Sequence, residues 1–113
     1  MAQNNQNYCT IYVVRHGQTN WNARGLTQGE TDIPLNREGI KQAKALKEDL
    51  KDIKFDGIFS SNLIRAKRTA EIIALERKLA VATTHLLRER RYGKFEGKPH
   101  HMMDELHKIK ETL

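Results

Sequence analysis

The feature that most constrains the fold is the alternation of short β-type runs with stretches of helical spacing. Residues 8–14 (YCTIYVV) are rich in β-branched and aromatic side chains and predict a buried strand. Shorter runs at residues 57–60 and 79–84 predict two further strands. Strands that alternate with helices favour a parallel sheet with right-handed crossovers. The sequence therefore predicts an α/β fold.

The segments between these runs predict helices. Asn36 is placed to cap a first helix that ends near residue 51, and Ser61 to cap a second. A last helix is expected over residues 102–113. The apolar faces repeat every three or four residues: Ile40, Ala43, Leu46 and Leu50, then Leu63, Ala66, Ala70 and Ile73, then Met102, Leu106, Ile109 and Leu113. Residues 18–34 and 86–99 are expected to be loops, and long loops are often functional.

The chain of 113 residues accommodates one small domain, expected over residues 8–113 after a disordered polar tail at residues 1–7. No apolar run approaches the roughly 20 residues that cross a membrane, and no secretory signal is recognisable, so a cytoplasmic protein is expected. The single Cys9 excludes an intrachain disulfide, and its apolar surroundings predict a buried, inert thiol.

The charge balance indicates an anionic partner. Twenty Lys and Arg against fourteen Asp and Glu give a net charge of +6. Nucleic acid is disfavoured, because aromatic residues are few (6%) and the basic residues have acidic neighbours, as on solvated faces. Charge alone does not choose between the other anionic partners, a phosphorylated small molecule and a membrane surface.

Reactive side chains follow the carboxyl ends of the predicted strands, where open parallel sheets bind ligands. Arg15 and His16 follow the first strand, Arg65 lies in the first turn of the second helix, and Glu89 follows the third strand. Guanidinium groups grip phosphate oxygens, a neutral imidazole is a competent nucleophile, and a carboxyl group can protonate a leaving alcohol. Taken singly, Arg65 fits a solvated helix position better than a binding site, and Glu89, between Arg88 and Arg90, fits a surface salt bridge better than a catalytic role.

Four blocks of sequence favour the catalytic role of these residues over the structural one. RHGQTNWN at residues 15–22 is followed by QG, DxPL and GxxQA within residues 28–43, SSNLxRAxxTA at residues 60–70 and LRERRYGKFEG at residues 87–97. In this order they resemble the histidine phosphatase (phosphoglycerate mutase-like) superfamily. The resemblance implies a three-layer α/β/α fold with a mostly parallel sheet.

The resemblance also implies roles for the matching residues. His16 would carry the phosphoryl group, and Glu89 would be the acid that later activates water. Arg15 and Arg65 would bind phosphate, without a metal or other cofactor. The remaining matches would line the substrate side: Gly17, Asn22, Gln28, Gly29, Arg90, Arg91 and Tyr92. The carbonyl of Gly17 could also hold the imidazole tautomer.

One part of the family pattern has no counterpart. The family carries a second catalytic histidine on a later strand beside the first, and none of His85, His100, His101 or His107 fits it. The fold is therefore expected to be incomplete at its C-terminal end, with an exposed strand edge open to self-association. A fragment, a naturally short relative and an inactive member all remain explanations.

The resemblance favours the phosphatase branch. Gln18-Thr19 after the Arg-His-Gly run and Phe95-Glu-Gly97 are similar to phosphatases, and residues 88–98 are especially like the fructose-2,6-bisphosphatase-related type. The expected activity is phosphomonoester hydrolysis through a phosphohistidine, on a sugar phosphate or phosphoglycerate. A phosphoglycerate mutase and a phosphate-binding pseudoenzyme are the alternatives.

Overall fold

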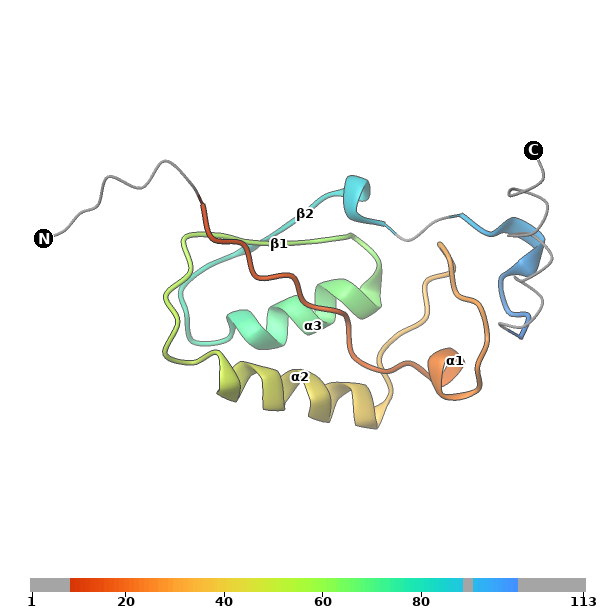
Figure 1. The fold of residues 1–113 in the computed structure, drawn as a ribbon, viewed down its shortest axis with the longest axis horizontal. Helices are drawn as coiled ribbons and strands as arrows, with labels where there is room; N and C mark the ends of the chain where they lie inside the picture. Colours follow the sequence, from red (N-terminus) through yellow and green to blue (C-terminus); the bar gives the residue numbers. More distant parts are fainter. Residues whose placement is uncertain (1–8, 89–90, 100–113) are drawn as a thin grey trace, which may run out of the picture.

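The fold comes from a computed structural model that describes residues 9–88 and 91–99. Its helices and strands are α1 (Asn20–Ala23), α2 (Arg37–Asp49), β1 (Ile58–Ser60), α3 (Ile64–Ala74) and β2 (Val81–Thr83), with single 3₁₀ turns η1 (His85–Leu87) and η2 (Gly93–Phe95) (Figure 1). The expected tail at residues 1–7 and the expected last helix at residues 102–113 lie outside the described residues.

The two described strands lie side by side and parallel, as the alternation predicted. Ile58 pairs with Val81 and Ser60 with Thr83, and α3 is the crossover between them. α3 packs against both strands and α2 packs against α3, so the described part is layered as sheet, α3, α2 (Figure 1). The buried apolar side chains lie on α3, on the residue before it and on α2: Leu63, Ala70, Ile72, Ile73, Ala74 and Ala43.

The start of α2 agrees with the capping prediction. The Asn36 side chain accepts a hydrogen bond of 2.8 Å from the backbone N–H of Gly39. Gly39 also allows residues 17–18 to lie directly against the helix, because a Cβ there would collide with the carbonyl of Gln18. A Cβ at Gly17 would collide in turn with the carbonyl of Gly39. The two glycines therefore bring the segment after His16 onto α2.

The start of α3 differs from the prediction. The helix begins at Ile64, and Ser61 is not its cap, although its hydroxyl accepts from the N–H of Leu63 at 3.3 Å. The N–H of Ile64 instead donates to the Asp32 carboxylate at 2.7 Å. Asp32 belongs to the loop before α2, so a contact distant in sequence replaces the local cap.

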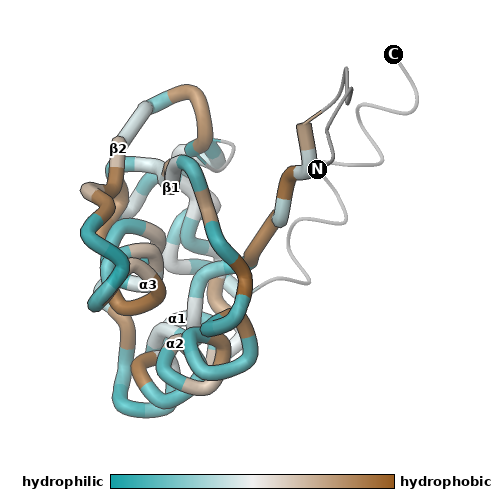
Figure 2. Tube along the Cα trace, turned by 90° about the vertical axis from the view of Figure 1, so that its left-hand side faces the viewer, coloured by the Kyte–Doolittle hydropathy of each residue, from teal (hydrophilic) through white to brown (hydrophobic). Residues whose placement is uncertain are grey.

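The prediction of a buried strand at residues 8–14 is wrong for the described residues, which form no strand there. Ile11 is 76% and Val13 92% exposed, and Cys9 is exposed rather than buried. Figure 2 shows this apolar stretch leaving the body of the molecule. A strand needs hydrogen bonds from the backbone of a neighbouring strand, and no backbone–backbone hydrogen bond involves residues 10–15 in the part of the chain that the structure describes.

A short helix also lies where the sequence predicted only loop. α1 is capped by Thr19, whose hydroxyl accepts from the N–H of Asn22 while the Asn22 side chain accepts from the N–H of Thr19. Across the described residues, every helix is too short or too polar to span a bilayer.

Candidate active site

Arg65 is the most deeply buried charged side chain of the expected site. Its exposed fraction is 1%, in the first turn of α3. The guanidinium group donates to the carbonyl of Gly29 at 2.6 Å and to the carbonyl of Thr31 at 2.8 Å. A buried charge needs such partners, and here they come from irregular backbone. Arg65 thereby fixes the loop at residues 29–31 against α3.

His16 is half-buried and connects to the same helix. Its Nδ1 lies 2.6 Å from the carbonyl of Gly17, and the N–H of Gly17 donates to the Thr69 hydroxyl at 3.0 Å. Thr69 lies one turn after Arg65 and donates to the Arg65 carbonyl at 2.7 Å. A chain of three hydrogen bonds thus runs from the imidazole to α3.

This geometry assigns a tautomer to the neutral imidazole. A carbonyl oxygen only accepts hydrogen bonds, so Nδ1 of His16 carries the proton and donates to Gly17. The lone pair of the neutral ring then lies on Nε2. An imidazole oriented in this way is suited to nucleophilic attack through Nε2.

Arg15, which is exposed, shares a small hollow with His16. The hollow has a volume of about 80 Å³ and opens between the segment at residues 15–17 and α2. Its walls are Arg15, His16, Gly17, Gln42, Ala43, Leu46 and Thr69. Arg15 and His16 therefore share the wall of this hollow. Thr69 connects His16 to the backbone carbonyl of Arg65, whereas the guanidinium group of Arg65 is bound to the carbonyls of Gly29 and Thr31.

The expected substrate-side residues Asn22 and Gln28 meet at Thr19, which is fully buried. The Thr19 hydroxyl donates to the Gln28 side-chain carbonyl, and Asn22 completes the capping box of α1. Gly29 has a φ of +55°, a conformation that side chains disfavour, and the Glu96 carboxylate occupies the space of its missing Cβ. Asn22 and Gln28 therefore join α1 to the loop that Arg65 holds.

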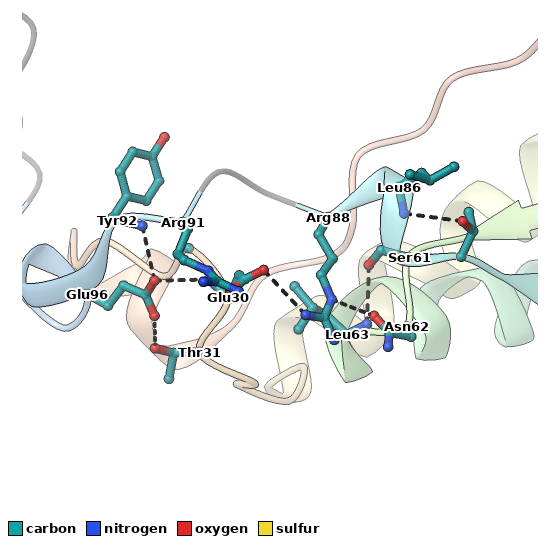
Figure 3. A network of polar contacts seen from close by, with 12 residues as sticks. Glu30, Thr31, Ser61, Asn62, Leu63, Leu86, Arg88, Arg91, Tyr92 and Glu96 are labelled. Carbon is teal, nitrogen blue, oxygen red and sulfur yellow. Dashed lines mark hydrogen bonds and ion pairs between the residues drawn. The ribbon is translucent and has the colours of Figure 1, made fainter.

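Glu96 holds the same loop from the other side. Its carboxylate accepts from the N–H groups of Glu30 and Tyr92, both at 3.2 Å, and from the Thr31 hydroxyl (Figure 3). Burial alone raises the pKa of the Glu96 carboxyl, but the hydrogen bonds from Thr31 and the backbone amides outweigh it and hold the pKa below 4.5. Tyr92 is thereby tied to the loop through its backbone.

The remaining expected residues divide into two groups. Arg91 forms an ion pair with Glu30, with 2.6 Å between Nε and Oε2. Glu89 and Arg90 lie outside the described residues. No cluster of three His, Cys, Asp or Glu able to hold a metal ion occurs within residues 9–88 and 91–99.

Comparison with known proteins identifies the family. The chain belongs to the histidine phosphatase superfamily (branch 1), whose family model matches residues 11–112. A solved structure of a mycobacterial glucosyl-3-phosphoglycerate phosphatase, in complex with VO3, superposes with a TM-score of 0.74 at 36% identity, over 80% of this chain and 45% of that protein. The fold is accordingly the phosphoglycerate mutase-like α/β fold.

Two curated relatives are similar in sequence. The uncharacterized phosphatase PhoE of Bacillus subtilis (strain 168) is 47% identical over 79% of this chain and 46% of its own length. The fructose-2,6-bisphosphatase TIGAR of Xenopus tropicalis is 44% identical over 79% of this chain and 34% of its own length. The chain thus spans less than half of the length of these relatives.

Sequence reasoning missed residues that position the site rather than form it. Thr69 links His16 to α3, Glu96 binds the loop beside Gly29, and Thr19 joins Asn22 to Gln28. Two signals were available: the Thr-x-x-Asn spacing of a capping box at residues 19–22, and the four-residue step from Arg65 to Thr69. No such spacing marks the contacts of Glu96 with Glu30 and Thr31, because these two partners are distant in sequence.

Proposed function

We propose that this chain is the nucleophile-bearing part of a phosphomonoester hydrolase that acts through a phosphohistidine at His16. The proposed substrate is a small phosphorylated metabolite, of the sugar phosphate or phosphoglycerate class. Family membership and the names of the two substrate-defined phosphatases among its relatives support this class.

The observation that carries the proposal is the contact between His16 Nδ1 and the carbonyl of Gly17. It directs the lone pair of the neutral ring to Nε2, and the link from Gly17 to Thr69 restrains the backbone on which the ring sits. A nucleophile held in advance in one tautomer and place lowers the cost of reaching the reactive geometry.

The other residues take the roles that the motifs imply. Arg15 and Arg65 bind the phosphate oxygens and offset their charge, which is the main need of phosphoryl transfer. Gly17 orients the imidazole. Glu89 is the proposed proton donor. The remaining residues, on the substrate side, are Asn22, Gln28, Gly29, Arg90, Arg91 and Tyr92.

The proposed reaction has two steps. Nε2 of His16 attacks phosphorus, the bond from phosphorus to the ester oxygen breaks, and the departing alcohol oxygen takes the proton of Glu89. A water then attacks the phosphohistidine, the bond from phosphorus to nitrogen breaks, and the Glu89 carboxylate takes the proton of that water. The products are the alcohol and inorganic phosphate, and the enzyme is restored.

The test is release of inorganic phosphate from an aryl phosphate, with metals chelated. Wild-type chain should release phosphate, and the H16A variant should release none. The matched control is His85→Ala, which removes an exposed imidazole on η1 and should keep the wild-type rate. A folded wild-type chain that releases no phosphate, or an H16A variant that keeps the rate, would contradict the proposal.

A second candidate is phosphate binding without turnover. The observation that favours it is the coverage of less than half of the relatives' length. It predicts that the folded chain binds inorganic phosphate, that Arg15→Met, which changes an exposed side chain, weakens this binding, and that no aryl phosphate is hydrolysed. A mutase would instead transfer the phosphoryl group to an added phosphoglycerate faster than to water.

A further inference from the structure

One side chain of α2 binds the peptide group that orients the imidazole. The N–H of Gln18 donates to Oε1 of Gln42 at 2.9 Å. This N–H belongs to the same peptide group as the carbonyl of Gly17, which lies 2.6 Å from Nδ1 of His16. A trans peptide group is planar, and its C=O and N–H point in opposite directions. His16 and Gln42 therefore bind the two ends of one rigid group.

The start of α2 places Gln42 beside this peptide group. Gly39 allows residues 17–18 to lie directly against the helix, because a Cβ there would collide with the carbonyl of Gln18. Gln42 follows Gly39 by three residues, so it lies on the same face of the helix, about one turn later. The two residues are the Gly and the Gln of the GxxQA motif, and the proposed function gives this Gln no role.

The neighbouring peptide groups have anchors of their own. The N–H of Gly17 donates to the Thr69 hydroxyl at 3.0 Å, and the carbonyl of Gln18 accepts from the N–H of Asn36, also at 3.0 Å. Three consecutive peptide groups after the imidazole are thus bound to α3, to Gln42 and to the N-cap of α2. Gln42 binds the middle group, whose carbonyl contacts the ring.

We propose that Gln42 is a positioning residue, which keeps the carbonyl of Gly17 directed at Nδ1 of His16 and so keeps the proton of the neutral ring there. The inference rests on the proposed function, in which Nε2 of His16 attacks phosphorus. A hydrogen bond at the N–H end also polarises the peptide group, which makes its carbonyl a stronger acceptor. Gln42 lines the same hollow as His16, but in this proposal it touches neither substrate nor the reacting atoms.

The competing explanation is an ordinary surface hydrogen bond. Gln42 is exposed, so water can accept from the N–H of Gln18 once the side chain is removed. The two explanations make different predictions for His16. A water molecule leaves the peptide group free to turn, whereas a side chain on α2 fixes the direction of its carbonyl.

The experiment is an NMR measurement of the two ring nitrogens of His16 in the 113-residue chain. It is made at about pH 9, where histidine side chains are ordinarily neutral, and the nitrogen shifts report which atom carries the proton. The signals of His16 are those absent from the H16A variant. Gln42→Leu removes the acceptor and should lower the ratio of the Nδ1–H to the Nε2–H form by about two- to tenfold, the range that one hydrogen bond spans.

Two further variants show whether the acceptor itself is responsible. Gln42→Glu keeps a side-chain oxygen for the N–H of Gln18 and should keep the wild-type ratio. The matched control is Lys44→Leu, which places a leucine at another exposed position of α2 and should leave the ratio unchanged. An unchanged ratio in folded Q42L would overturn the proposal, and so would a ratio in Q42E as low as in Q42L. If Q42L does not fold, the smaller Gln42→Ala takes its place, with the same outcomes.

Activity separates this inference from the proposed function. In a chain that hydrolyses aryl phosphate, Q42L should lower kcat by about two- to tenfold and leave KM unchanged, because Gln42 orients the nucleophile without binding substrate. A raised KM at an unchanged kcat would show that Gln42 binds substrate instead, and would overturn the inference. If the wild-type chain has no activity, the proposed function fails, and the tautomer of His16 still decides whether Gln42 orients the ring.

Discussion

Two segments of this chain differ in whether their backbone N–H and carbonyl groups have hydrogen-bond partners. The loop at residues 27–31 has no regular secondary structure, yet Gly29 and Thr31 give their carbonyls to Arg65, and Glu30 gives its N–H to Glu96. Residues 10–15 have a strongly β-type sequence, yet they form no backbone–backbone hydrogen bond within the described residues, and Val13 is 92% exposed.

The difference shows what orders a segment in this fold. Charged side chains from α3 and from the loop near η2 satisfy the polar backbone of an irregular loop, so the loop is fixed without a helix or strand. A run of β-branched residues lacks this support until another strand provides hydrogen bonds. His16 directly follows residues 10–15, and its link through Gly17 to Thr69 connects it to α3, the helix that also holds the loop through Arg65.

The largest expected effect comes from removing the centre of the ordered segment. Arg65→Met leaves the carbonyls of Gly29 and Thr31 without their charged donors and should lower the free energy of unfolding by about 3 to 5 kcal/mol. Chemical denaturation measures this change. Arg68→Met, on the exposed side of the same helix, is the control and should change it by less than about 0.5 kcal/mol. Equal changes in the free energy of unfolding for the two variants would contradict the claim that Arg65 orders the loop at residues 27–31.

Glu96→Gln should cost less, about 2 kcal/mol, because the neutral amide accepts more weakly than a carboxylate with three donors. The effect should also depend on pH. The pKa of Glu96 is lowered from 4.5 in the folded chain, so its contribution is complete above the pKa of the unfolded chain and is lost as pH falls through the folded value.

Unfolding measured at several pH values between neutral and strongly acid checks this sign. The difference in stability between wild type and E96Q should shrink as the pH decreases below 4.5. Glu71→Gln, whose carboxylate lies 4.0 Å from Arg68 on an exposed face, is the control. A difference that grows toward acid would mean that Glu96 is not held as a carboxylate.

Thr69→Val sharpens the comparison at the boundary between the segments. The N–H of Gly17 loses its acceptor, and the expected cost is about 1 to 2 kcal/mol in the free energy of unfolding. Because Gly17 orients the imidazole, the rate of phosphate release should fall by more than the loss of stability alone explains. Thr83→Val, on an exposed position of β2, is the matched control for both measurements. If Thr69→Val lowers the stability but leaves the activity unchanged, Thr69 does not position His16.

The smallest expected effect is in the unpaired segment. Val13→Lys should change the free energy of unfolding by less than about 0.5 kcal/mol, since the side chain is 92% exposed. The sequence analysis expected self-association through a strand edge at this segment; if copies associate through residues 10–15, the lysine should weaken association in sedimentation experiments. A decrease of several kcal/mol in the free energy of unfolding of the monomer would show that residues 10–15 are packed, and would contradict the difference drawn between the two segments.

The sequence predicted the elements that local signals specify. Asn36 and the apolar spacing located α2, and the β-type runs located β1 and β2, although Leu79, Ala80 and Thr84 lie outside the shorter β2. The errors occurred where a distant partner decides. Asp32 rather than Ser61 receives the first N–H of α3, and residues 8–14 needed a neighbouring strand that sequence periodicity cannot supply.

The motifs named the residue types of the expected site, but they did not give the contacts of those residues. The motifs singled out His16 and Arg65, whereas the contacts of Arg65 with two loop carbonyls require the folded chain. The contacts of Glu30 with Arg88 and of Glu96 with the N–H of Glu30 join residues more than fifty positions apart, so the sequence pattern did not predict them. Such long-range contacts depend on tertiary structure, which local pattern does not encode.

The central claim is that His16 carries the phosphoryl group, and its most direct test is to locate that group. The folded chain is incubated with an aryl phosphate, quenched in alkali, in which phosphohistidine survives, and digested with trypsin. Cleavage after Arg15 and Arg24 yields a peptide that begins with His16 and contains no other histidine. The account predicts an acid-labile phosphoryl group on His16 of this peptide and none in the H16A variant. A folded chain that carries no phosphoryl group there, or carries it elsewhere, would contradict the account.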